Sequence, residues 1–87
     1  MAAELRKWAP GFPQHHISKV IDLAEFNSAK SGVFECRRGE KVTFAYKLGS
    51  KHYPCTEKFA VTLFGYLRAM KFDWFKALDL TRAPLAA

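Results

Sequence analysis

The chain of 87 residues has few cysteines, no long apolar run and little negative charge. Cys36 and Cys55 are too few for the disulfide framework on which small secreted domains depend. No apolar run approaches the roughly 20 residues that a membrane span needs. The first residues, MAAELRKWAPGF, lack the apolar core of about 7 to 15 residues typical of a secretion signal. These absences predict a cytoplasmic protein that does not enter a membrane.

Sequence motifs of catalysis and of cofactor binding are also missing. The chain contains no nucleophile elbow and no glycine-rich phosphate loop. Cys36, His52 and Cys55 have the character of zinc ligands, but no C-x-x-C pair or second nearby histidine supplies a fourth ligand. His52 is close enough to Cys55 in sequence to act as its base, yet no acidic residue near His52 is suited to orient it. We therefore expect a non-enzymatic protein without metal or cofactor, in which both cysteines are small core residues.

Bulky and basic residues are abundant. Hydrophobic residues make up 49% of the chain, and eight Phe, three Tyr and two Trp supply rings that each bury on the order of 150 to 250 Å². This suffices for one domain, which we expect to have an arm at 1–13, a globular core at 14–80 and a tail at 81–87. Fourteen Lys and Arg against eight Asp and Glu give a net charge of +6. Such a balance suits nucleic acid, an acidic protein surface or an anionic membrane; of these, we expect nucleic acid or an acidic protein surface as the partner.

The spacing of apolar residues predicts two main helices and a short last one. Between 14 and 26, apolar side chains recur at i, i+3, i+4 and i+7, which is typical of an amphipathic helix; they are Ile17, Val20, Ile21 and Ala24. Thr56 is suited to cap a second helix that extends to about Met70. The aromatic residues that follow predict a short third helix.

Turn residues at 38–40 and 49–50 separate three expected strands, at 33–37, 41–48 and 51–53. The sequence therefore predicts an α+β domain of two layers, in which a three-stranded antiparallel sheet packs against helices. Its order is α-β-β-β-α with a short C-terminal helix.

Alternation within the expected strands predicts one apolar and one basic side of the sheet. In the strand at 41–48, one side carries Val42, Phe44, Tyr46 and Leu48, and the other carries Lys41, Thr43, Ala45 and Lys47. In the strand at 33–37, we expect two residues to point inward, Phe34 and Cys36. The outward residues of that strand are then Val33, Glu35 and Arg37.

The basic side of the sheet is the candidate binding site. Its predicted nucleic-acid-binding residues are Arg37, Arg38, Lys41, Thr43, Lys47 and Lys51, and the expected flanking contacts are Arg6, Lys7 and Arg68. Lysine and arginine neutralise phosphates, and the short Thr43 and Ala45 allow the sheet to approach a groove closely. Exposed charge also keeps a sheet soluble and prevents its edges from aggregating. The residues alone leave binding and solubility open as explanations.

The segment from Ser31 to Met70 begins with S-G-V-F and continues with a turn, a strand, the turn Gly49-Ser50-Lys51 and a helix rich in alanine and aromatics. This order resembles the AP2-type and integrase N-terminal DNA-binding domains. Those domains are three-stranded sheets packed on a helix, and their sheet lies in the major groove of DNA. The resemblance implies a DNA-binding role for the same six candidates, Arg37, Arg38, Lys41, Thr43, Lys47 and Lys51.

The surplus of aromatic residues supports an alternative function. Phe72, Trp74 and Phe75 either close one end of a small core or form an exposed anchor for a partner. If Trp74 and Phe75 are buried, nucleic-acid binding is favoured. An exposed apolar patch instead favours a small phage or mobile-element protein, similar to anti-CRISPR inhibitors, that binds and modulates a host protein complex. A homodimer is a further alternative for such a patch.

Overall fold

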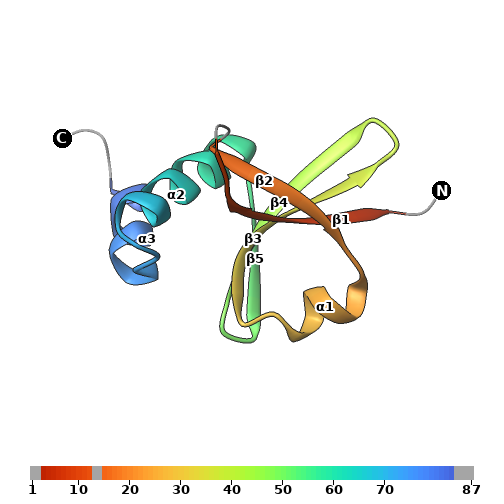
Figure 1. The fold of residues 1–87 in the computed structure, drawn as a ribbon, viewed down its shortest axis with the longest axis horizontal. Helices are drawn as coiled ribbons and strands as arrows, with labels where there is room; N and C mark the ends of the chain where they lie inside the picture. Colours follow the sequence, from red (N-terminus) through yellow and green to blue (C-terminus); the bar gives the residue numbers. More distant parts are fainter. Residues whose placement is uncertain (1–2, 13–14, 84–87) are drawn as a thin grey trace.

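The computed structural model describes residues 3–12 and 15–83. Figure 1 shows α2 and α3 together at one end of the molecule, and α1 lying apart from them beside the sheet. None of the helices in these ranges is long and apolar enough to cross a membrane. In chain order the elements are β1 (Glu4–Pro10), β2 (His16–Ile21), α1 (Leu23–Ser28), β3 (Ser31–Arg38), β4 (Lys41–Leu48), β5 (Lys51–Cys55), α2 (Glu57–Ala69) and α3 (Trp74–Arg82).

All five strands belong to one antiparallel sheet, in the order β2-β1-β3-β4-β5. The predicted three-stranded sheet is therefore wrong in strand number, although the fold is still α+β with a sheet packed against helices. The strand predicted at 41–48 is confirmed as β4, and turns at both of its ends join it to β3 and β5. β5 extends through Pro54, which is tolerated because β5 is an edge strand.

The two strands that were not predicted lie in the N-terminal part of the chain. The helix predicted at 14–26 is wrong, because His16–Ile21 form β2 and only the six residues of α1 are helical. Isoleucine and valine are β-branched and favour a strand once a partner strand is available. That partner is β1, in the segment expected to be an arm, and Pro10 stands at its end. Of the expected tail, residues 81–82 belong to α3; positions 1–2, 13–14 and 84–87 lie outside the described residues.

The pairing register assigns each strand residue to one of two faces of the sheet, because successive side chains alternate. Val33 is paired with Tyr46, and both are buried in the core with α2 and α3; we call this side the helix face. Phe34 is paired with Ala45 on the opposite side, where the Phe26 ring of α1 lies 4.9 Å from the Phe34 ring; we call this side the α1 face. The register places these residues on the α1 face: Leu5, Lys7, Ala9, Ile17, Lys19, Ile21, Gly32, Phe34, Cys36, Arg38, Lys41, Thr43, Ala45, Lys47, His52 and Pro54.

The main core lies between the helix face and the pair α2 and α3. Its buried members are Trp8, Val33, Tyr46, Ala60, Leu63, Phe64, Leu67, Ala77 and Leu78. Thr56 caps α2 as predicted, since its Oγ1 accepts a hydrogen bond of 3.1 Å from the Phe59 N–H. Asp73 caps α3 in the same way. The short third helix that the sequence predicts is confirmed as α3.

Gly32 is the position in β3 where a side chain would disturb the α1 face. Its φ is +154°, a conformation that L residues rarely adopt, and a Cβ atom there would lie 2.9 Å from Cζ of Phe34. We predict that Gly32→Ala lowers the free energy of unfolding by about 1 to 3 kcal/mol, because backbone strain and displacement of the ring both act. Urea denaturation measures this change.

Gly65→Ala is the matched control for this substitution. Gly65 lies within α2, and a Cβ atom there would meet open space. The same change should therefore raise the free energy of unfolding by about 0.5 to 1 kcal/mol through helix propensity. Equal effects of the two substitutions would contradict the proposed strain at Gly32.

Candidate nucleic-acid interface

The carboxylates of the strands are confined to one face of the sheet. The strands contain two carboxylates, Glu4 and Glu35, and the register places both on the helix face. Each has an arginine partner: Arg6 Nη2 lies 2.9 Å from Glu4 Oε2, and Arg37 Nε lies 2.7 Å from Glu35 Oε2. The strand residues of the α1 face include no carboxylate. Their cations are Lys7, Lys19, Arg38, Lys41 and Lys47.

Four of these cations form two cross-strand pairs of like charge. Lys7 lies directly opposite Lys19, and Arg38 lies directly opposite Lys41. Like charges in such positions destabilise a sheet. The two ion pairs found among the described residues include none of the four. Lys7 is half-buried and the other three are exposed, so the α1 face carries positive charge that an anion can reach.

Three of the six predicted site residues come together on this face. Arg38, Lys41 and Thr43 are exposed on neighbouring positions of β3 and β4, near the turn that joins the two strands. Of the expected flanking contacts, Lys7 lies beside this group, whereas Arg6 is on the helix face and Arg68 is in α2. Lys19 was missed, because its place on this face depends on the pairing of β2 with β1. A single lysine in this segment identifies a face only after the segment is known to be a strand.

Arg37 and Lys51 lie on the helix face, on the opposite side from the other candidates. The register pairs Arg37 with Val42 and Lys51 with Leu48. The predicted inward and outward residues of β3 are therefore reversed: Val33 and Glu35 face the helix layer. Two successive apolar residues, Val33 and Phe34, make the alternation ambiguous, and α1 buries the second of them on the other side.

Lys47 is on the α1 face but is buried, with 4% of its surface exposed. Its Nζ donates hydrogen bonds to the carbonyls of Phe26 (2.7 Å) and Asn27 (3.1 Å) near the end of α1, and it lies 5.0 Å from the centroid of the Phe26 ring. A cation is favoured at the C-terminal end of a helix, where carbonyls lack helical partners. Lys47 thus holds α1 against the sheet and is not exposed to an external partner.

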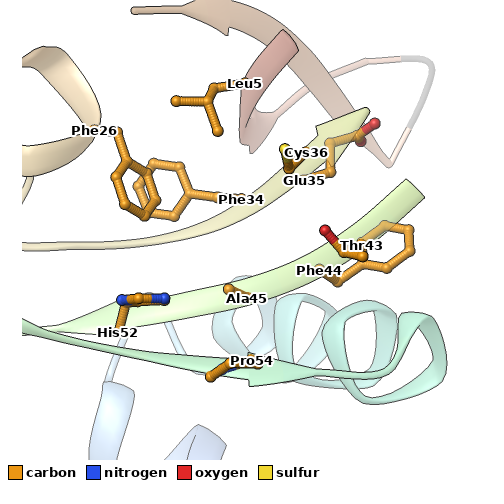
Figure 2. Close-up of a pocket in the computed structure, with 10 residues that line it drawn as sticks. All are labelled: Leu5, Phe26, Phe34, Glu35, Cys36, Thr43, Phe44, Ala45, His52 and Pro54. Carbon is orange, nitrogen blue, oxygen red and sulfur yellow. The ribbon is translucent and has the colours of Figure 1, made fainter. Parts of the chain in front are cut away.

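A hollow of about 280 Å³ lies on the α1 face beneath α1. Figure 2 shows Phe26, Phe34 and His52 at one end of it and Thr43 at the other. Between them the surface is mainly apolar. The α1-face and α1 side chains that border the hollow are Leu5, Phe26, Phe34, Cys36, Thr43, Ala45, His52 and Pro54.

Glu35 lies on the helix face and accepts two side-chain hydrogen bonds there. Its Oε1 accepts a hydrogen bond of 2.6 Å from Trp8 Nε1, and its Oε2 accepts one of 2.7 Å from Arg37 Nε. Burial by itself raises the pKa of Glu35, but the hydrogen bonds from Trp8 and Arg37 and the charges of Arg37 and Arg6 outweigh burial and leave the pKa below its usual value. The Glu35 carboxylate is therefore charged and fully engaged within the protein.

Cys36, His52 and Cys55 do not form a common site. In β5 the register directs His52 to the α1 face, whereas Cys55 packs against the core on the helix face. Burial raises the pKa of the Cys55 thiol, which opposes the thiolate that a nucleophile requires. Both cysteines are free thiols. Within residues 3–12 and 15–83, no three metal-binding side chains are grouped closely enough to hold an ion.

Glu35→Gln tests the charge of the buried carboxylate. The amide can still accept from Trp8, but it loses the ion pair with Arg37. Because the folded-state pKa is lowered, the stability from this charge is fully present above the usual value of 4.5 and is lost as the pH falls through the folded-state value. At neutral pH we predict a loss of about 1 to 3 kcal/mol in the free energy of unfolding.

Urea denaturation at neutral pH and well below pH 4 measures this effect. The difference between Glu35→Gln and the parent should shrink at the acidic pH. Glu4→Gln is the control: the Glu4 side chain is 39% exposed in its ion pair, so this change should cost at most about 1 kcal/mol. An unchanged difference for Glu35→Gln at both pH values would contradict the assignment.

Comparison of the chain with protein-family models, with curated proteins and with solved structures found no match. The resemblance of Ser31 to Met70 to AP2-type and integrase N-terminal domains therefore stays a prediction. The α1 face combines an apolar hollow with cations at neighbouring strand positions that have no ion-pair partner among the described residues.

Proposed function

We propose that this chain is a non-enzymatic module that binds nucleic acid, most readily DNA, through the α1 face. The observation that carries the proposal is the distribution of carboxylates over the sheet. Both strand carboxylates lie on the helix face and are paired with arginines, whereas the strand residues of the α1 face include cations and no carboxylate. The acidic residue nearest to Arg38 and Lys41 in the sequence is Glu40, which is exposed in the turn between them. A surface of this kind attracts a polyanion and releases the counterions of that polyanion on binding.

Solubility alone does not account for this arrangement. A solvated sheet face needs exposed charge, but mixed signs across the strands would supply that charge without repulsion. The α1 face instead has cation opposite cation at two places, Lys7 with Lys19 and Arg38 with Lys41. Measured along β3, the two pairs are about four residues or roughly 13 Å apart, and they also stand on different strands. This spacing suits contact with phosphates that are not adjacent in one strand. The free thiols of Cys36 and Cys55 are stable in a reducing compartment, so we assign this function to the cytoplasm.

Replacing the cations of one pair tests the proposal. We predict that the double variant Arg38→Gln/Lys41→Gln reduces the slope of log affinity against log salt by about 1.4 to 1.8, since each phosphate contact contributes about 0.7 to 0.9. Fluorescence anisotropy with labelled oligonucleotides, titrated at several salt concentrations, measures the slope. The control Lys58→Gln/Lys76→Gln removes the same charge from exposed positions in α2 and α3. Equal slopes for both variants would refute binding by the α1 face.

A second candidate function has its own supporting observation. Trp74 packs against the core, with its ring 6.4 Å from that of Tyr46, but Phe75 is 76% exposed and Phe72 is 42% exposed. Exposed aromatic residues of this kind are common anchors of protein interfaces. The exposed rings of Phe72 and Phe75 support the alternative of a small phage or mobile-element protein that modulates a host protein complex. They are also compatible with a homodimer.

Phe75→Ser separates the two candidate functions. Since Phe75 is far more exposed than the core aromatics, its loss should change the free energy of unfolding by less than about 0.5 kcal/mol. We predict unchanged oligonucleotide affinity for this variant. If a partner protein or a second copy binds through α3, the variant should lose that complex in analytical ultracentrifugation. Loss of oligonucleotide binding in Phe75→Ser would instead place the nucleic acid on the wrong side of the molecule for our proposal.

A further inference from the structure

The hollow on the α1 face has a size and lining that the proposed charge contacts do not explain. Its volume is about 280 Å³, slightly below the range of roughly 300 to 1,000 Å³ usual for small-molecule pockets. It therefore has room for one planar ring system and not for a larger ligand. Ala45 and Pro54 form an apolar part of the lining, and the short alanine side chain leaves the space open.

Two rings border one end of the hollow. His52 is exposed, and it meets Phe26 edge to face, with ring centroids 5.8 Å apart and an interplanar angle of 74°. His52 and Phe26 are thus not stacked on each other. Histidine and phenylalanine are among the side chains on which unpaired bases stack. Phe26 is held in place by α1, whose terminal carbonyls are bound by Lys47.

The cations and the hollow together define a ligand with a flat apolar part and a negatively charged chain. Arg38 and Lys41 lie beyond the Thr43 end of the hollow, because they follow Cys36 and precede Thr43 in their strands. Lys7 is paired with Phe34, which borders the opposite end. Cations thus lie beyond both ends of the hollow; Glu35, which also borders it, is already paired with Arg37. The Thr43 hydroxyl supplies a donor and an acceptor for a base edge.

From this arrangement we infer that the hollow binds one unstacked base of a single-stranded nucleic acid, while the cation pairs contact the neighbouring phosphates. The inference rests on the proposed function and specifies its ligand. In a duplex the base faces are stacked within the helix, so they are not available to enter the hollow. The chain should therefore bind a single strand more tightly than a duplex of the same length.

The test compares two single-stranded oligomers of equal length and charge, an oligothymidylate and an abasic phosphodiester. We expect the oligothymidylate to bind about 5- to 150-fold more tightly, which corresponds to stacking of one base. His52→Ala should abolish most of this difference and leave the affinity for the abasic oligomer unchanged. His15→Ala is the matched control, since His15 is exposed near α2, 3.2 Å from Arg68 Nη1, and it should change neither affinity.

A second measurement follows the base directly. A 2-aminopurine in the single strand should gain fluorescence when it leaves its neighbouring bases and enters the hollow of the parent protein. Ala45→Leu fills the hollow and should prevent this increase, and circular dichroism verifies that the variant is folded. If Ala45→Leu does not fold, His52→Ala provides the same comparison from an exposed position.

The outcomes distinguish the inference from the function on which it rests. Equal affinity for the oligothymidylate and the abasic oligomer would overturn base binding and leave phosphate binding intact. Tighter binding of the duplex than of the single strand would also overturn it. Absence of binding to every oligonucleotide at low salt would refute the proposed function itself. Specific binding of an apolar peptide in the hollow would overturn base binding and assign the hollow to a protein partner.

Discussion

The hydrogen bond between Trp8 and Glu35 is the contact on which the arrangement of both sheet faces depends. It joins β1 to β3 through a carboxylate that is 5% exposed, and Arg37 satisfies the other oxygen. A buried carboxylate without these donors would be costly, so Glu35 has a strong preference for the face where Trp8 lies. Once Glu35 is fixed there, alternation assigns Phe34, Cys36 and Arg38 to the opposite face.

The α1 face is completed by a second buried charge. Lys47 donates to two carbonyls of α1 and thereby holds the Phe26 ring over the sheet. The same short helix buries Phe34 and forms a wall of the hollow. One basic residue of this face therefore has a structural role, while the cations farther along the strands have no ion-pair partner within residues 3–12 and 15–83. Chemical type alone does not separate these two roles, because only burial and hydrogen bonding distinguish Lys47 from Lys41.

The sequence was most informative where structure is determined locally. Alternation and adjacent turn residues correctly predicted β4, and the Thr56 cap correctly predicted the start of α2. The N-terminal strands were not predicted, because Ile17, Val20 and Ile21 have a spacing that fits a helical stripe as well as an edge strand. Their choice of structure depends on pairing with β1, a nonlocal contact. Arg37 was assigned to the wrong side for a related reason: the successive apolar residues of β3 fit either face until α1 covers one of them.

The like-charge pairs across the strands would couple the proposed binding of a polyanion to folding. Folding brings these cations together, and the repulsion between them is part of the cost of forming the free sheet. In the unfolded chain the same side chains are farther apart, so a polyanion gains most by associating with the folded form. A bound polyanion would thus offset a repulsion that the protein otherwise carries alone. By this linkage, the repulsion between the cations of the α1 face would be greatest in the free domain and would be screened in the proposed complex.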